Sequence, residues 1–356
     1  MPARNRSKAI VHHVKAFQLT AHGVPGQFAL RDLPDPQPGP GEVIVDVHAC
    51  GLNRLDLWLE EAGLPISVPL PRTPGCEIAG RIAATGKDVE GWTVGDRVAV
   101  QSNLFCGRCE FCQRGDESLC LRGELVGITR DGGFAERVLV PASALVRLPA
   151  ELSFETAAAL TLAGSTAMHM LANRARVNRG EWVLVIGAAS GVGSAAIQIA
   201  RHLGARVITT GSTEPKRRLG LELGAEAALD ANSDWPAAVR RLTNRRGVDL
   251  VVEHVGGDVL QKAFDCLARG GTIVTCGATG GRDVPFKLWP FFVKQHQLIG
   301  SYGRTRADMV ATLDWAARGI LKPVIDSVLS LERVPEAFAK LRARLVLGKV
   351  VIAVKP

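Results

Sequence analysis

The stretch Trp182-Val-Leu-Val-Ile-Gly-Ala-Ala-Ser-Gly-Val-Gly193 decides the fold. It opens with an apolar run that is typical of a buried parallel strand and continues into a turn of small residues. The pattern after it predicts a helix over residues 195–203. A strand, a tight turn and a helix in this order form a pyrophosphate site, because small residues let the backbone approach the phosphates and the helix N-terminus supplies free N–H groups. The alternative is an ordinary tight turn between a strand and a helix.

Strands and helices alternate on both sides of this turn, from about residue 153 onwards. Ser153 begins a capping signature for the first of these helices. The alternation predicts a parallel sheet with helices on both faces, which is the doubly wound arrangement of dinucleotide-binding domains. Further strands are expected at residues 206–210, 250–252, 272–275 and 348–354, and further helices at residues 153–162, 215–223, 235–243, 259–267 and 307–318.

The part of the chain before residue 153 has a different pattern. Its apolar and polar residues alternate in short runs, and turns containing Gly and Pro separate these runs. This spacing predicts a compact, mainly antiparallel β domain, so the fold class is α/β with two kinds of sheet. The expected strands are residues 43–48, 78–84, 97–101 and 135–140.

Length and composition exclude several classes of protein. A chain of 356 residues suggests about two domains. The net charge of +8 comes from scattered basic residues and aromatic residues make up only 5% of the chain, so we expect no nucleic acid as a primary partner. No apolar run is long enough to cross a bilayer, and we expect no membrane partner. The first stretch, residues 1–13, is basic and polar, and we expect a loose leader there.

Four of the eight cysteines lie close together, as Cys106-Gly-Arg-Cys109-Glu-Phe-Cys112 followed by Cys120. Four thiolates close a tetrahedral shell around zinc and leave no open coordination position, so this spacing predicts one structural zinc. An iron–sulfur site would have a shorter last gap and a proline after the last cysteine, where this chain has Leu121. The alternative is unligated or disulfide-forming cysteines. A close cluster without a signal peptide indicates a reducing compartment, and we expect the cytoplasm.

The end of the second strand predicts which dinucleotide binds. A site for NAD has an acidic residue there that binds the ribose 2′-hydroxyl, and this chain has Gly211 at that position. Glycine removes the repulsion of a 2′-phosphate, Ser212 can donate a hydrogen bond, and Lys216 or Arg217 can supply positive charge. The sequence therefore favours NADP(H). Two alternatives remain: Glu214 turns inward, or the basic residues form a solvated first turn of a helix.

Together these stretches resemble the medium-chain dehydrogenase/reductase superfamily, which contains the zinc alcohol dehydrogenases and the quinone oxidoreductases. The resemblance implies a GroES-like catalytic domain from residues 1–160 and 302–356, with a zinc lobe at residues 106–120. It also implies a Rossmann domain at residues 161–301, and dimers or tetramers. The resemblance covers about residues 15–356 and rests on Gly39-Pro-Gly-Glu-Val, Pro74-Gly-Cys-Glu-Ile-Ala-Gly80, Gly95-Asp-Arg-Val, the cysteine lobe, Gly187 to Gly193, and Gly348-Lys-Val-Val.

The departures from the family's pattern concern the catalytic zinc. The three positions that resemble the zinc ligands of alcohol dehydrogenases hold Asn53, Cys76 and Leu162 in this chain. Only Cys76 and its neighbour Glu77 can bind a metal, and a catalytic zinc needs about three protein ligands. We therefore expect no catalytic zinc. Asn53 is similar to the asparagine found at this place in zinc-free quinone oxidoreductases.

The resemblance thus implies an NADPH-dependent reductase of quinones or α,β-unsaturated carbonyls, in which Asn53 donates a hydrogen bond to the developing anion. Thr166 and the loop that begins Cys276-Gly277 match residues at the nicotinamide end, while Ala188 and Ser190 replace the first two glycines of the usual fingerprint. The predicted catalytic residues are Asn53, Asp56, Cys76, Glu77 and Thr166, and the predicted cofactor site contains Thr166, Ser190, Gly191, Val192, Gly193, Gly211, Ser212, Lys216, Cys276, Gly277 and Lys349.

Simpler roles and rival functions remain open at this stage. Asn53 can brace its loop, Cys76 can be a small buried hydrophobe, and Asp56 and Glu77 can form local salt links. The first rival function is an alcohol or aldehyde dehydrogenase with an atypical zinc site. The second is a non-catalytic NADPH-binding sensor or an RNA-binding protein. In every catalytic version the substrate is a small molecule: a quinone, an enone or an aldehyde.

Overall fold

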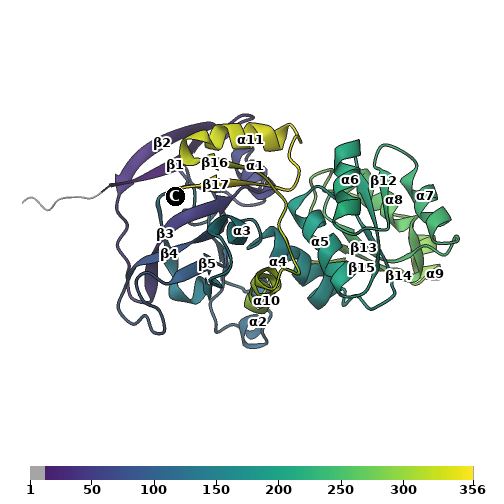
Figure 1. The fold of residues 1–356 in the computed structure, drawn as a ribbon, viewed down its shortest axis with the longest axis horizontal. Helices are drawn as coiled ribbons and strands as arrows, with labels where there is room; N and C mark the ends of the chain where they lie inside the picture. Colours follow the sequence, from purple (N-terminus) through teal and green to yellow (C-terminus); the bar gives the residue numbers. More distant parts are fainter. Residues whose placement is uncertain (1–12, 356) are drawn as a thin grey trace, which may run out of the picture.

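Two large sheets organise the molecule, and they lie in two units joined side by side (Figure 1). The structure is a computed structural model that describes residues 13–355. The expected leader, residues 1–13, lies outside the described part apart from His13. Within that part, no helix is both long enough and apolar enough to cross a membrane.

The first sheet has six parallel strands in the order β12-β11-β10-β13-β14-β15. This is the doubly wound order of dinucleotide-binding domains, so the predicted fold class is confirmed. The strand order reverses between β10 and β13, and ligands of such sheets bind beyond the carboxyl ends of the strands at that point. The strands are β10 (Trp182–Val185), β11 (Arg206–Gly211), β12 (Ala227–Asp230), β13 (Val248–Glu253), β14 (Leu267–Thr275) and β15 (Gln297–Gly300).

Strand β10 is apolar on both faces because both are covered by helices. Val183 and Val185 pack into one buried cluster, whereas Leu184 and Ile186 pack into another on the opposite face. The helices of this unit are α5 (Gly191–His202), α6 (Glu214–Glu222), α7 (Trp235–Leu242), α8 (Gly257–Phe264) and α9 (Leu288–Val293).

The second sheet has seven strands and is antiparallel except between β16 and β17. Its central row joins distant parts of the chain, because β17 pairs with β3 and β3 pairs with β4. The strands are β3 (Glu42–Gly51), β4 (Glu77–Thr85), β5 (Arg97–Val100), β8 (Arg137–Pro141), β9 (Leu145–Arg147), β16 (Ile325–Ser330) and β17 (Lys349–Ala353), and the hairpin β1 (His13–Ala21) with β2 (Gln27–Pro34) lies beside them.

Short elements connect the two units and carry the site. Helices α4 and α10 contact each other where the units meet, and α4 also contacts α5 (Figure 1). The expected helix over residues 153–162 is interrupted: α3 ends at Ala158 and α4 begins at Ala163. The elements are α1 (Arg54–Glu60), α2 (Glu110–Gln113), α3 (Phe154–Ala158), α4 (Ala163–Met168), α10 (Arg306–Ala317), α11 (Val334–Arg342), β6 (Asn103–Leu104) and β7 (Glu124–Leu125).

Candidate cofactor site, active site and metal centre

The turn between β10 and α5 has the geometry of a phosphate-binding turn. Gly187 has a φ of +74°, which favours glycine, and a Cβ on Gly193 would lie 2.1 Å from the carbonyl oxygen of Gly187. The N–H group of Val192 has no acceptor among the described residues, whereas the Gly191 N–H lies at the isolated parallel bridge between Ser190 and Gly348. A free N–H group at the start of a twelve-residue helix fits the pyrophosphate of a dinucleotide.

Ser190 has a structural role that the sequence did not reveal. Its hydroxyl oxygen accepts a hydrogen bond from the Gly193 N–H at 2.8 Å and caps helix α5. The same oxygen lies 2.9 Å from Nε2 of His254, which follows the carboxyl end of β13. His254 was not predicted, although its position after the strand beside β10 is a signal for the cofactor site. The imidazole thus holds the phosphate-binding turn through Ser190.

Burial lowers the pKa of His254 from 6.5 to about 4. The folded protein therefore keeps the imidazole neutral, while the unfolded chain binds a proton below about pH 6.5. As the pH falls from 6.5 towards 4, this residue is expected to destabilise the folded state, at up to about 1.4 kcal/mol per pH unit. Thermal unfolding of His254→Gln should show a smaller loss of Tm than wild type between pH 6.5 and 4.5. The exposed His202 is the control, since His202→Gln should match wild type. Equal losses in H254Q and wild type would contradict the prediction.

The end of β11 leaves no room for an acidic side chain. A Cβ on Gly211 would lie 2.9 Å from the backbone nitrogen of Arg217. The Arg217 guanidinium lies over this position, 3.4 Å from the Gly211 carbonyl oxygen and 3.5 Å from the Asp230 carboxylate. The ammonium of Lys216 instead donates to the Arg344 carbonyl oxygen at 2.9 Å. Arg217 is therefore better placed than Lys216 to meet a group bound beside Gly211.

Asn53, Glu77 and Lys349 meet in one buried row of the second sheet. Strands β3 and β17 pair Gly51 with Val351, and continuing this antiparallel register by two residues brings Asn53 opposite Lys349. The Lys349 ammonium donates to Asn53 Oδ1 at 2.7 Å and lies 2.7 Å from Glu77 Oε2. The other Glu77 oxygen accepts the backbone N–H groups of Leu162 and Ala163 at 2.8 and 2.7 Å. These bonds give Glu77 a partner on each side, and they start helix α4 at Ala163.

Asp56 positions its neighbours rather than facing a cleft. It is fully buried, and its two oxygens accept the N–H groups of Asn53 at 2.8 Å and Gly75 at 3.1 Å. Burial raises the pKa of Asp56 to about 7, against the opposing effect of these N–H donors. The carboxyl group thus ties the start of α1 to the loop that precedes Cys76.

Cys76 is also fully buried, and it packs in an apolar cluster whose members include Leu19 and Ile128. Burial raises the pKa of Cys76 well above its usual value, so the thiol stays protonated. Among the described residues, Cys76 does not belong to any group of three or more potential metal ligands. The structure therefore favours the simpler role considered for this residue, a small buried hydrophobe.

The residues expected at the nicotinamide end follow α4 and β14. Thr166 is 8% exposed and lies in helix α4, one turn after the N–H groups that Glu77 accepts. Cys276 follows β14, and burial raises the pKa of its thiol to about 12. A Cβ on Gly277 would lie 2.3 Å from the His254 carbonyl oxygen, so the loops after β13 and β14 are in close contact.

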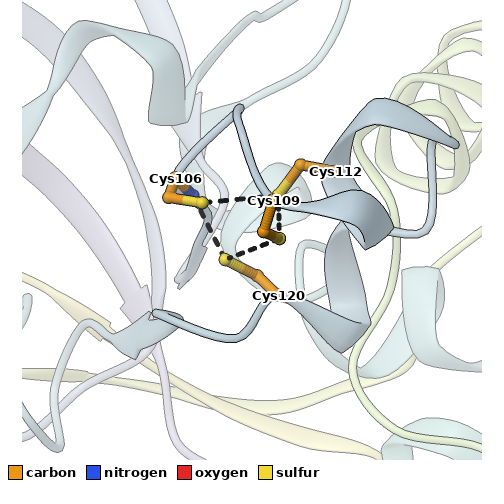
Figure 2. A group of neighbouring side chains, drawn as sticks. All are labelled: Cys106, Cys109, Cys112 and Cys120. Carbon is orange, nitrogen blue, oxygen red and sulfur yellow. Dashed lines mark hydrogen bonds between the residues drawn. The ribbon is translucent and has the colours of Figure 1, made fainter.

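The four clustered cysteines point toward one another in the lobe around α2 (Figure 2). Their sulfur atoms all lie within 4.8 Å of one another, and three of the separations are 3.4, 4.0 and 4.0 Å. Four sulfurs at 2.3 Å from a tetrahedral zinc would be about 3.8 Å apart, so the donor set fits this ion. Backbone N–H groups of Cys112 and Leu121 lower the pKa of Cys109 to about 6, which favours a thiolate.

Two family models and an alcohol dehydrogenase match most of this chain. A family model described as zinc-binding dehydrogenase matches residues 191–318, and one described as the alcohol dehydrogenase GroES-like domain matches residues 39–150. An alcohol dehydrogenase of Geobacillus stearothermophilus is 31% identical over 92% of this chain and 95% of its own length.

Two solved structures are similar over nearly the whole chain. The crystal structure of an NAD-dependent alcohol dehydrogenase has a TM-score of 0.90 and 38% identity, and covers 96% of this chain and 100% of its own. A zinc-binding dehydrogenase of Sinorhizobium meliloti, solved bound to NADP, has a TM-score of 0.85 and 28% identity, and covers 96% of this chain and 99% of its own.

Proposed function

Because the chain belongs to the medium-chain dehydrogenase/reductase superfamily and is an NAD(P)-dependent oxidoreductase, we propose that it reduces quinones or α,β-unsaturated carbonyls with NADPH and without a catalytic zinc. The observation that carries this proposal is the Asn53 amide, whose oxygen is held by Lys349 at 2.7 Å. Because the relatives of this chain are enzymes, the alternative of a non-catalytic NADPH-binding sensor or RNA-binding protein is not pursued.

The residues around Asn53 support hydride transfer without a Lewis-acidic metal. The positions that resemble zinc ligands hold an amide, a buried thiol and Leu162. The Glu77 carboxylate is occupied by Lys349 and two backbone N–H groups. A catalytic zinc needs about three protein ligands and an open position, and this set does not provide them. The enolate or quinol anion formed from an electron-poor acceptor needs less stabilisation than the alkoxide of a simple alcohol. A hydrogen-bond donor is sufficient to stabilise it.

The residues present can divide the reaction between them. The turn with Gly191 and Val192 would hold the pyrophosphate of NADPH, which would supply the hydride when bound. Thr166, in α4, and Cys276, after β14, would contact the nicotinamide end of the cofactor. Asn53 Nδ2 donates a hydrogen bond to the substrate oxygen, where negative charge develops as the hydride adds to the β-carbon or the quinone. Water then returns a proton to the enolate or quinol anion.

The preference for NADPH rests on Gly211, Ser212 and Arg217. Gly211 excludes the carboxylate that would bind a ribose 2′-hydroxyl, and Arg217 supplies a guanidinium for a 2′-phosphate. A similar zinc-binding dehydrogenase was solved bound to NADP, whereas another similar structure is of an NAD-dependent enzyme. The site around Gly211 favours the first behaviour for this chain.

Arg217→Ala is expected to raise the KM for NADPH about tenfold or more, because a charge-assisted bond to the 2′-phosphate is lost. The KM for NADH should stay within about twofold, since NADH has no 2′-phosphate. Lys216→Ala is the matched control, and its effect should be smaller because its ammonium is bonded to Arg344. Steady-state kinetics with both cofactors measures this, and a larger effect in K216A than in R217A would contradict it.

We further propose that the four-cysteine lobe holds one structural zinc, with no open position for a substrate. We also propose a reducing compartment such as the cytoplasm, because four clustered cysteines must stay reduced to bind this zinc ion.

We also propose a homodimer or homotetramer. Strand β15 is an edge strand of the parallel sheet, and α9, which precedes it, exposes Leu288, Trp289 and Phe292. An exposed apolar patch beside an unpaired strand edge supports association of two copies there.

The second candidate function is alcohol oxidation with an atypical zinc site, because the relatives are named alcohol dehydrogenases. Metal content and substrate choice separate the two candidates. We expect about one zinc ion per chain by elemental analysis, and NADPH oxidation with 1,4-benzoquinone or 2-cyclohexenone. Two zinc ions per chain, with oxidation of 1-butanol and no reduction of either acceptor, would overturn the proposed function.

A further inference from the structure

We propose that Lys349 is a positioning residue, which fixes the Asn53 amide so that its NH2 group faces the substrate oxygen. This rests on the proposed function, because it requires that Asn53 meets the substrate. The resemblance to the superfamily assigned Lys349 to the cofactor site, where a lysine would bind a phosphate. The contacts of Lys349 in the structure indicate a different role.

The Lys349 ammonium donates hydrogen bonds to the Leu52 carbonyl oxygen and to Asn53 Oδ1, each at 2.7 Å. It also forms an ion pair with the Glu77 carboxylate, whose Oε2 lies 2.7 Å away. Lys349 is 5% exposed and Glu77 is fully buried, so water does not compete for these contacts. Two of the three N–H donors are thus bonded within the protein, and the charge is paired with a buried carboxylate, so the ammonium is not directed at a phosphate.

The chemistry of the ammonium determines the orientation of the Asn53 side chain. Because Lys349 only donates, the atom of Asn53 that it contacts must be the carbonyl oxygen. The NH2 group then lies on the other side of the amide, where its contact with the described residues is a long 3.4 Å bond to the Gly51 carbonyl oxygen. The amide thus keeps a donor available for a substrate oxygen.

The position of the ammonium is itself fixed from two directions. Glu77 is anchored by the N–H groups of Leu162 and Ala163 at the start of α4. The aliphatic stem of Lys349 packs against the phosphate-binding turn, because a Cβ on Gly191 would lie 2.6 Å from Lys349 Cδ. Lys349 therefore contacts the cofactor turn through its stem and the catalytic amide through its charge.

Without the Lys349 ammonium, the side-chain amide of Asn53 should turn over, so that its oxygen and its NH2 group exchange places. In Lys349→Met, the Leu52 carbonyl oxygen loses its donor and the Glu77 carboxylate loses its paired charge, and the NH2 group of Asn53 is the neighbouring donor that can replace them. The amide then presents Oδ1 to the substrate oxygen, and two acceptors repel each other. We expect kcat for 2-cyclohexenone to fall about 100-fold, while the Kd for NADPH stays within about twofold of wild type.

The test is a double-mutant cycle of Lys349→Met and Asn53→Ala, measured as kcat with 2-cyclohexenone and as NADPH binding by fluorescence. If Lys349 acts through Asn53, removing it from a chain that already lacks the amide should have no further effect, so the double variant should have the same kcat as N53A. Lys355→Met is the matched control, since Lys355 pairs with Asp46 at 3.0 Å and has no contact with Asn53. It should retain wild-type kcat and Kd.

Lys349→Gln is a second variant in case K349M does not fold, because its amide keeps two N–H donors for Asn53 and Glu77. It should retain more of the wild-type kcat than K349M, or be measurably active where K349M is unfolded. A K349M protein with unchanged kcat, or with a loss confined to the Kd of NADPH, would overturn the inference and support phosphate binding. A wild-type protein that reduces neither quinones nor enones would instead contradict the proposed function.

Discussion

Asn53→Ala is expected to lower kcat for 2-cyclohexenone by roughly 10²–10³-fold, the usual cost of removing one preorganised donor from a developing oxyanion. The KM for NADPH should change little, since Asn53 lies at the N-terminal cap of α1 and not in the phosphate-binding turn. The loss should appear in kcat because the hydrogen bond strengthens as charge develops on the substrate oxygen.

Asn178→Ala is the control for this variant, because Asn178 is an exposed asparagine that bonds only to Glu181 among the side chains of the described residues. Its kcat should equal that of wild type. A further comparison is Asn53→Asp, which keeps an acceptor for Lys349 but has no donor, and should be as slow as N53A. Wild-type activity in both N53A and N53D would show that the substrate oxygen is stabilised by another group.

Cys109→Ser is expected to have the largest effect on stability. Cys109 Sγ lies 3.4 Å from Cys112 Sγ and 4.0 Å from Cys120 Sγ, so its loss breaks the tetrahedral donor set. The zinc content should fall from about one ion per chain to well below half, and the free energy of unfolding by on the order of 5 kcal/mol. Elemental analysis and thermal unfolding measure these two quantities.

Cys266→Ala is the control for the metal site, because Cys266 is buried in the core beneath α8 and is not one of the clustered cysteines. It should retain its zinc. C109S molecules that remain folded should lose less kcat than N53A, since the lobe is separate from Asn53 and joins α10 through a 3.0 Å bond from the Arg306 N–H to Glu117. Full zinc occupancy in C109S would contradict the four-cysteine assignment.

The parts of the fold that were predicted correctly are those whose signal is local. The apolar run from Trp182 predicted β10, because a strand covered on both faces is apolar at every position. Ser153 predicted the start of α3, and its hydroxyl accepts the Thr156 N–H at 3.1 Å. The four cysteines were predicted to lie together because their spacing is short, and the structure confirms that they do.

The parts that were missed depend on contacts between distant residues. The helix expected over residues 153–162 is interrupted because Glu77, from another strand, accepts the N–H groups that start α4. Strands β12 and β15 were not predicted, since their residues are only half-buried or exposed and lack a strong alternating pattern. The contact between Lys349 and Asn53 joins positions 296 residues apart, and no local pattern indicates it.

The close approach of Gly191 to the Lys349 stem has an evolutionary consequence. A methyl group at position 191 would overlap the lysine side chain, so an alanine there is compatible only with a shorter or displaced residue at position 349. The effects of mutations at the two positions on the free energy of unfolding should therefore be non-additive, because an alanine at position 191 should destabilise the fold less when residue 349 is shorter. Among homologous proteins, a glycine in the nucleotide fingerprint would then persist for the sake of a lysine on another strand, rather than for the phosphates alone.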